Sequence, residues 1–287
     1  MRIHPSQKSE ETGRVDAFVS PTAAAPVLIG FDGAEGGRDA LELGRLLGSI
    51  RGSRCIVAIP DEGVAAEARE ALGDAEAKTQ AIGVISPALQ LVECAKREDA
   101  GTLVLGSTRR GKLGRALLGS TSEQVLHKAP CEVVVAPRGY AAERHERLAK
   151  VGVAVDGSPE SRVALARAED LARQAGAEIE ILVASDPLVS SVEAEFPRDT
   201  PSSESDVLEA AVSSVDPALA ATGKKVDPGW RQVVRTIAAA LAEACDPDVD
   251  LLVAGSRRPM DRFLLGSVTK HLITEAPCPV LVVSHAR

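Results

Sequence analysis

Two loops of the chain have the composition of a phosphate-binding segment. Each opens and closes with Gly-Ser: residues 106–120 read GSTRRGKLGRALLGS, and residues 255–267 read GSRRPMDRFLLGS. Glycines let a backbone wrap an anion with its N–H groups, and a helix that starts at the closing serine favours negative charge there. The first loop carries four basic residues and no acid, and the second carries three arginines against one aspartate. An anion pocket is therefore indicated, with solvated loop charges as the plainer alternative.

An acid followed by glycine stands upstream of each loop, as Asp32-Gly33 and as Asp156-Gly157. Each pair directly follows a β-branched run that predicts a strand. Ligands of open parallel sheets bind beyond the carboxyl ends of the strands, where the strand order reverses. We therefore expect the acid and the loop of each set to lie at one edge of a sheet.

The two sets belong to an internal repeat. FDG at 31–33 recurs as VDG at 155–157, an offset of 124, and APCEVVVAP at 129–137 recurs as APCPVLVVS at 276–284, an offset of 147. The offset grows because the second copy contains an insertion, which we place at the Ser, Pro and acid-rich stretch 187–206 and expect to be a surface loop. Ser120-Thr121-Ser122-Glu123 has the pattern of a capping box at a helix start.

Each copy alternates short β-branched runs with longer amphipathic ones, which predicts a parallel sheet covered by helices. Five strands and four helices per copy make an α/β, doubly wound unit. The expected strands are 27–30, 55–59, 79–84, 102–105 and 132–136, then 151–155, 179–184, 224–226 (or as far as 233), 251–254 and 280–283. The expected helices of the first copy are 38–50, 64–78, 86–98 and 122–128.

Composition limits the classes of function. The 287 residues suggest two domains against a prior of about 150 residues each. Aromatic residues are 2% of the chain and the net charge is −8, which argues against a protein that coats nucleic acid or an anionic membrane. The five cysteines form no C-x-x-C pair, no residues have metal-ligand spacing, and no run has the length of a membrane span. We expect a cytoplasmic protein with an N-terminal arm over 1–25, domains at 26–137 and 151–287, and a linker at 138–150.

The loop pattern with its flanking segments resembles the universal stress protein family. The resemblance includes Gly-x-x-Gly, nine residues and Gly-Ser/Thr, followed by a helix and APC-x-V-x-V-V, and it covers nearly all of 26–286. The stretches VAVDGSPESRVALARAEDLA and GSVTKHLITEAPCPVLVV are similar to tandem bacterial members. The resemblance implies Rossmann-like sheets of order 3-2-1-4-5, two domains packed edge to edge through strand 5, and in many members a bound ATP, with or without Mg²⁺.

In the first copy, the resemblance assigns a role to most loop residues. Gly106 and Gly119 are 13 steps apart, as the family pattern requires, and Ser107 follows the first of them. The second glycine of the pattern is replaced by Arg109, which either clamps phosphate or fills the space. Asp32 matches the acid beside the nucleoside, the backbone of Ile59 matches the contact with adenine, and the residues implied to hold phosphates are Gly119, Ser120 and Thr121.

In the second copy, the matching positions are Asp156, Ala184, Gly255, Gly266, Ser267 and Val268. Gly255 and Gly266 are only 11 steps apart, and Pro259 removes a backbone donor from the loop. We therefore expect the first copy to bind the nucleotide better than the second.

The expected function is a stress-linked sensor or regulator that binds an adenine nucleotide, which orders residues 106–120 and changes a surface seen by unidentified protein partners. No residue stands out as a catalytic base, so slow ATP hydrolysis is the most activity expected, and a homodimer is left open. One alternative is a nucleotide-free interaction module of the same fold. A weaker one is an ATP-using adenylating enzyme, because Glu35-Gly36-Gly37-Arg38-Asp39 faintly resembles an S-G-G-x-D-S pyrophosphate loop that lacks its first serine.

Overall fold

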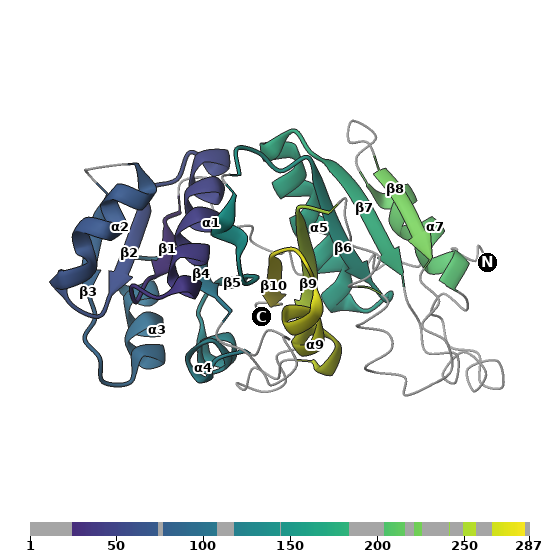
Figure 1. The fold of residues 1–287 in the computed structure, drawn as a ribbon. Helices are drawn as coiled ribbons and strands as arrows, with labels where there is room; N and C mark the ends of the chain where they lie inside the picture. Colours follow the sequence, from purple (N-terminus) through teal and green to yellow (C-terminus); the bar gives the residue numbers. More distant parts are fainter. Residues whose placement is uncertain are drawn as a thin grey trace, which may run out of the picture.

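Ten strands form one continuous mixed sheet in the computed structural model (Figure 1). The structure describes residues 25–73, 77–107, 118–143, 145–183, 204–215, 221–225, 241, 249–256 and 266–284. The strand order is β3-β2-β1-β4-β5-β10-β9-β6-β7-β8, so each copy has the predicted order 3-2-1-4-5. The two copies join where β5 pairs antiparallel with β10, with Val134 opposite Leu281 at the centre. The predicted α/β fold and the packing through the fifth strand are both confirmed.

The elements of the two copies correspond closely. The first copy consists of β1 (Val27–Gly30), α1 (Glu35–Arg51), β2 (Cys55–Ile59), η1 (Glu62–Val64), α2 (Ala65–Leu72), β3 (Lys78–Ala81), α3 (Pro87–Arg97), β4 (Thr102–Gly106), α4 (Ser120–Lys128) and β5 (Glu132–Ala136). After η2 (Tyr140–Ala142) come β6 (Lys150–Val155), α5 (Pro159–Ala175), β7 (Glu178–Val183), α7 (Glu204–Ser214), β8 (Ala221–Lys225), β9 (Leu251–Ser256), α9 (Ser267–Glu275) and β10 (Val280–Ser284).

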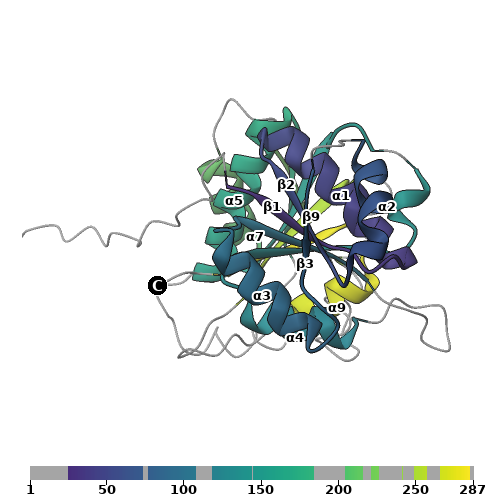
Figure 2. The same ribbon diagram turned by 90° about the vertical axis from the view of Figure 1, so that its left-hand side faces the viewer.

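Helices cover both faces of the sheet (Figure 2). Successive strand residues point to opposite faces, so Val27 and Ile29 pack in one core and Leu28 in the other. The first core includes residues of α1, α2, α5 and α7, and the second includes residues of α3, α4 and α9. Each core draws residues from both copies, so the hydrophobic interior runs across the β5–β10 junction without interruption.

Several expected boundaries were wrong. The helix expected over 64–78 ends at Leu72, because Gly73 takes the left-handed conformation (φ +66°) that terminates a helix. The strand expected over 79–84 is β3, which ends at Ala81, and the strand expected at 224–226 is β8, three of whose five residues lie earlier. The insertion expected as a loop over 187–206 ends in helix, since α7 begins at Glu204; residues 187–203 lie outside the described residues.

The segment between the two copies is fastened to α1. The buried carboxylate of Asp39 accepts hydrogen bonds from the backbone N–H groups of Gly139 (3.1 Å) and Ala141 (2.8 Å). Burial raises the pKa of Asp39, and these two N–H donors oppose the rise. Tyr140 is buried and stacks on His145 with ring centroids 3.9 Å apart. The chain therefore crosses from one copy to the other along a defined path.

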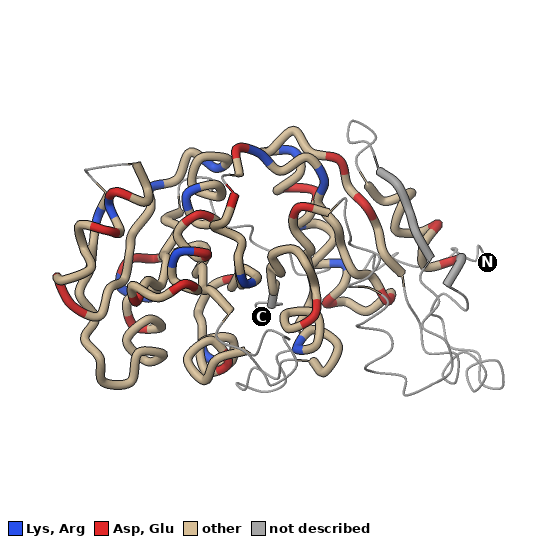
Figure 3. Tube along the Cα trace, viewed as in Figure 1, with Lys and Arg blue, Asp and Glu red and all other residues tan. Residues whose placement is uncertain are grey.

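A buried ionic cluster joins the copies beneath this path. We call it the seam cluster, and it consists of Arg51, Thr102, Glu132, Arg167 and Asp170. Arg167 of α5 donates to both carboxylate oxygens of Glu132 in β5, at 2.6 and 2.9 Å, and Arg51 of α1 donates to the same carboxylate. The side chains of these three residues are between 1% and 4% exposed. Thr102 also donates to Glu132, and Asp170 accepts from Arg167 at 2.7 Å. Figure 3 shows both signs of charge along the trace where α1 and α5 approach each other.

Candidate functional site

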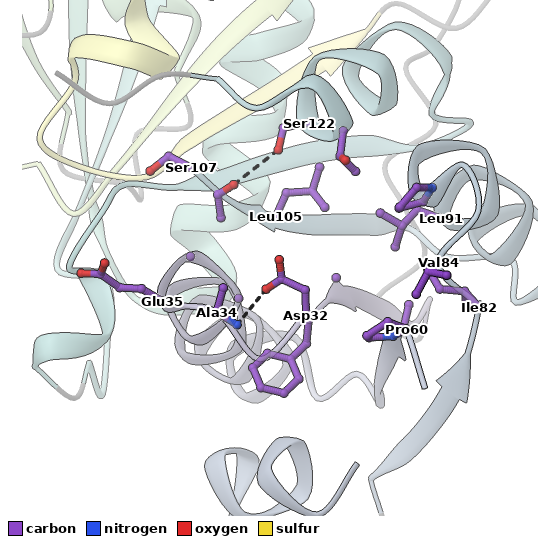
Figure 4. A pocket seen from close by; sticks show the side chains of 18 of the residues that line it. Asp32, Ala34, Glu35, Pro60, Ile82, Val84, Leu91, Leu105, Ser107 and Ser122 are labelled. Atoms are coloured by element: carbon purple, nitrogen blue, oxygen red, sulfur yellow. Dashed lines mark hydrogen bonds between the residues drawn. The ribbon is translucent and has the colours of Figure 1, made fainter. Parts of the chain in front are cut away.

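A pocket of about 910 Å³ lies at the carboxyl edge of the first copy's strands. The lining comes from β1, β4 and the turns that follow them, from the β3–α3 connection, and from the start of α4, whose Ser122 lies beside the end of β4 (Figure 4). Four residues predicted for the site line it, namely Asp32, Gly106, Ser107 and Thr121. The structure thus brings these four residues together at the edge where the strand order reverses, and their role in binding a ligand stays a prediction.

Asp32 is held in a tight turn immediately after β1. One carboxylate oxygen accepts a hydrogen bond from the backbone N–H of Ala34 (3.0 Å), and the side chain points into the pocket (Figure 4). Gly33 makes the turn with φ +79°. The second copy repeats the arrangement, because Asp156 accepts from the N–H of Ser158 at 3.0 Å and Gly157 has φ +80°. Both copies thus present an acceptor at the end of their first strand.

The glycine that opens each loop is required by packing. A Cβ on Gly106 would lie 1.8 Å from the carbonyl oxygen of Gly36, and one on Gly255 would lie 2.5 Å from that of Glu160. These glycines let the fourth strand of each copy touch the start of its first helix. In the Glu35–Asp39 motif, a Cβ on Gly36 would lie 2.7 Å from the Ser107 carbonyl oxygen. That contact gives the motif a structural explanation that needs no pyrophosphate.

Ser107 lines the pocket, and its hydroxyl is buried beside it. The residue is 4% exposed, and its backbone N–H donates to the carbonyl of Ala136 (2.9 Å). Its Oγ has no hydrogen-bond partner among the residues that the structure describes. A buried hydroxyl without a partner costs about 1–3 kcal/mol, and this one would pair with a ligand only if its side chain turned toward the pocket.

The start of α4 is the second polar part of the pocket. Its N-cap is Gly119, and no side chain caps the helix. The capping box expected at Ser120–Glu123 was wrong: Glu123 turns instead to Lys270 of α9 at 2.5 Å, and that ammonium lowers the pKa of the Glu123 carboxyl. The first N–H groups of a helix have no partner within the helix, and the helix dipole makes this end attractive to anions. Thr121 and Ser122 line the pocket here, whereas Gly119 and Ser120 are not among the residues that line it.

The apolar wall of the pocket was not foreseen from the sequence. It consists of Pro60, Ile82, Val84, Leu91 and Leu105. Val84 is 71% exposed, and the next residue, Ile85, is 80% exposed. The period-2 pattern of Ile82 and Val84 resembles a strand, and Gly83 (φ +75°) between them was the signal that the strand had ended.

Ile59 is placed differently from the expectation. Its side chain is fully buried in the core, and its carbonyl accepts a hydrogen bond from the N–H of Ile82 (2.8 Å). Its neighbours Ala58 and Pro60 line the pocket instead. The Ile59 carbonyl, expected to lie near adenine, is thus already an acceptor for the N–H of Ile82.

The second copy repeats part of the polar arrangement. α9 begins after Gly266 without a side-chain cap, as α4 does after Gly119. Thr269 donates to the carbonyl of Gly255 (3.0 Å), and Ser122 makes the corresponding bond to Gly106 (3.4 Å). Gly266 and Ser267 are exposed, and Val268 packs against the core. Two predicted residues, Arg109 and Ala184, lie outside the described residues.

Comparison with known proteins identifies the family of the chain. The profile of the Universal stress protein family matches residues 56–137 and 148–284, one match in each copy. The chain belongs to the universal stress protein family. A universal stress protein of Mycobacterium tuberculosis (strain H37Rv) is 32% identical over 197 residues, which are 64% of this chain and 62% of the relative. The match therefore spans less than two thirds of that relative's length.

Solved universal stress proteins share the fold. One from Archaeoglobus fulgidus has a TM-score of 0.62 and 19% identity, over 93% of this chain and 99% of its own. Another, solved in complex with cAMP, covers 40% of this chain and 97% of its own at 22% identity; its TM-score of 0.33 is too low to assign that ligand here. Among the described residues, no helix is long and apolar enough to cross a membrane, and no three His, Cys, Asp or Glu side chains are grouped to hold a metal.

Proposed function

We propose that the first copy binds an adenine nucleotide, ATP before others, and that the protein is a regulator that responds to this binding by a change of conformation. The observation that carries the proposal is one pocket that combines an apolar wall with a helix start that no side chain caps. A nucleotide has the matching parts: a flat apolar base and a chain of anionic phosphates.

Each part of the pocket would hold one part of the ligand. The base would lie against Pro60, Ile82 and Val84, which would remove the exposed Val84 from water. The free carboxylate oxygen of Asp32 would accept a ribose hydroxyl. The phosphates would be held by Ser107 and by the N–H groups at the start of α4, with or without Mg²⁺. In the sequence, the segment that connects β4 to α4 adds positive charge, since residues 106–120 include four basic residues and no acid.

The second copy would bind nucleotide more weakly. Its loop is two residues shorter and contains Pro259, which has no N–H to donate to a phosphate. Asp156 and the start of α9 repeat only the acceptor and the helix end of the first site. We therefore place the functional site in the first copy.

Calorimetric titration of the full chain, first stripped of bound ligand, tests the proposal. ATP should bind, and Gly119→Val should abolish binding, because a β-branched side chain at the N-cap would crowd phosphates that approach the first N–H groups of α4. Gly266→Val is the matched control in the second copy and should leave binding intact. No heat at millimolar ATP would favour the nucleotide-free interaction module, and loss of binding only in Gly266→Val would place the site in the second copy. Steady release of ADP would add a hydrolytic activity.

A further inference from the structure

Arg138 lies at the mouth of the pocket, two residues after β5. Its guanidinium donates to the carboxylate of Glu35 at the start of α1, with Nη2 to Oε2 at 3.0 Å and Nε to Oε1 at 3.3 Å. Both residues line the pocket. The two side chains are 39% and 62% exposed, so the pair is accessible to a ligand that enters.

The main chain at Arg138 is fixed even though its side chain is half exposed. The next residue, Gly139, and then Ala141 donate their N–H groups to the buried carboxylate of Asp39. Tyr140 between them is buried. The main chain of Arg138 is therefore fixed beside the pocket, while the guanidinium can move from one hydrogen-bond partner to another.

The charges of the pocket wall are unbalanced around this residue. Among the described residues that line the pocket, Arg138 is the one cation, and it shares the lining with the carboxylates of Asp32 and Glu35. An exposed pair such as Arg138–Glu35 is weak because water and salt screen it. A phosphate offers a guanidinium two parallel, charge-assisted hydrogen bonds, which are stronger.

We propose that Arg138 determines specificity for ligands that carry phosphate: Glu35 holds it in the empty pocket, and the phosphate chain displaces Glu35 from it. This inference rests on the proposed function. It predicts opposite effects for the two members of one ion pair. Arg138 favours the phosphates, and Glu35 opposes them, both by competing for Arg138 and by repelling negative charge.

The test is calorimetric titration of the full-length protein with ATP and with adenosine. Arg138→Gln should weaken ATP binding about 5- to 10-fold, the loss expected for a charge-assisted bond that is partly exposed. Glu35→Gln should strengthen ATP binding about 2- to 5-fold, because a like charge is removed a few ångströms from the phosphates. Adenosine, which lacks phosphate, should bind all three proteins equally.

Glu67→Gln is the matched control. Glu67 pairs with Arg38 of the same helix α1 at 2.7 Å, with side chains 41% and 54% exposed, and neither residue lines the pocket. This variant makes the same charge change as Glu35→Gln and should leave both affinities unchanged. Thermal melting of each variant checks that the fold is retained.

Three results would overturn the inference. Unchanged ATP affinity in Arg138→Gln would mean that the arginine does not meet the phosphates. Weaker ATP binding in Glu35→Gln would mean that Glu35 itself holds the ligand. An equal loss for adenosine and ATP in Arg138→Gln would reduce the residue to a structural role. Failure of the unaltered protein to bind either compound would instead refute the proposed function, and the inference with it.

Discussion

Replacing Glu132 by glutamine should destabilise the whole molecule by about 3–5 kcal/mol, the range for breaking a buried ion pair from one side. The Glu132 carboxylate accepts two hydrogen bonds from Arg167, one from Arg51 and one from Thr102, with its side chain only 3% exposed. Without its negative charge, two guanidiniums would face each other where water cannot enter. Arg167→Met should cost less, near the lower end of that range, because Glu132 keeps Arg51 and Thr102.

Urea unfolding followed by circular dichroism measures this effect. With an m-value of about 3 kcal/mol/M, the midpoint of Glu132→Gln should fall by about 1–1.7 M. Since the sheet and both cores cross the β5–β10 junction, one transition is expected, with an unchanged m-value. Glu93→Gln is the control, because Glu93 forms an exposed pair with Lys96, and it should cost less than about 0.5 kcal/mol. A loss below about 1 kcal/mol in Glu132→Gln, or a larger loss in Arg167→Met, would refute this account of the seam cluster.

Three further outcomes are expected. Gly106→Ala should lower the free energy of unfolding by about 1–3 kcal/mol and reduce the melting temperature, because its Cβ would overlap the carbonyl oxygen of Gly36; an unchanged melt would contradict the close packing. Ser107→Ala should raise the unfolding free energy of the empty protein by about 1 kcal/mol while weakening ATP binding, and a loss of stability would show that the hydroxyl already has a partner. Because Lys270 lowers the pKa of folded Glu123, the stability from this exposed pair is present above the unfolded pKa of about 4.3 and is lost as the pH falls through the folded value. Glu123→Gln should therefore reduce, by about 0.5 kcal/mol, the free energy of unfolding that the protein loses on acidification. The same loss in the variant and in the unaltered protein would show that the pair does not contribute.

Local patterns predicted what depends on neighbours in the sequence. The expected strand 27–30 is β1, because its β-branched run is bounded by a proline and an acid–glycine turn. Asp32 and Gly106 were placed at one edge because both follow strands of the same parallel sheet. Ile82 and Val84 were missed because an alternating pattern continued beyond the last strand residue, and only the neighbouring glycine indicated the turn.

Contacts between distant residues could not be predicted in the same way. Arg138 meets Glu35 across 103 residues, and Arg167 meets Glu132 across the junction of the two copies. Neither pair is marked by a periodic pattern in the sequence. Arginine and glutamate are also usually exposed, so their burial in a cluster is not expected from residue type. The repeat shows that the Arg167–Glu132 pair has no equivalent in the other copy. At the offset of 147 residues Glu132 corresponds to Pro279, and at the offset of 124 residues Arg167 corresponds to Leu43.

The junction of the two copies has become selective for unlike partners. Val134 and Leu281 are equivalent positions of the repeat that pair with each other, and so are Glu123 and Lys270, both separated by 147 residues. A pseudo-twofold axis therefore passes between them. Two first copies placed around such an axis would bring glutamate against glutamate, and two second copies would bring lysine against lysine. The charges at this junction thus favour pairing of the two unlike halves within one polypeptide, and β5 and β10 already use their outer edges on each other.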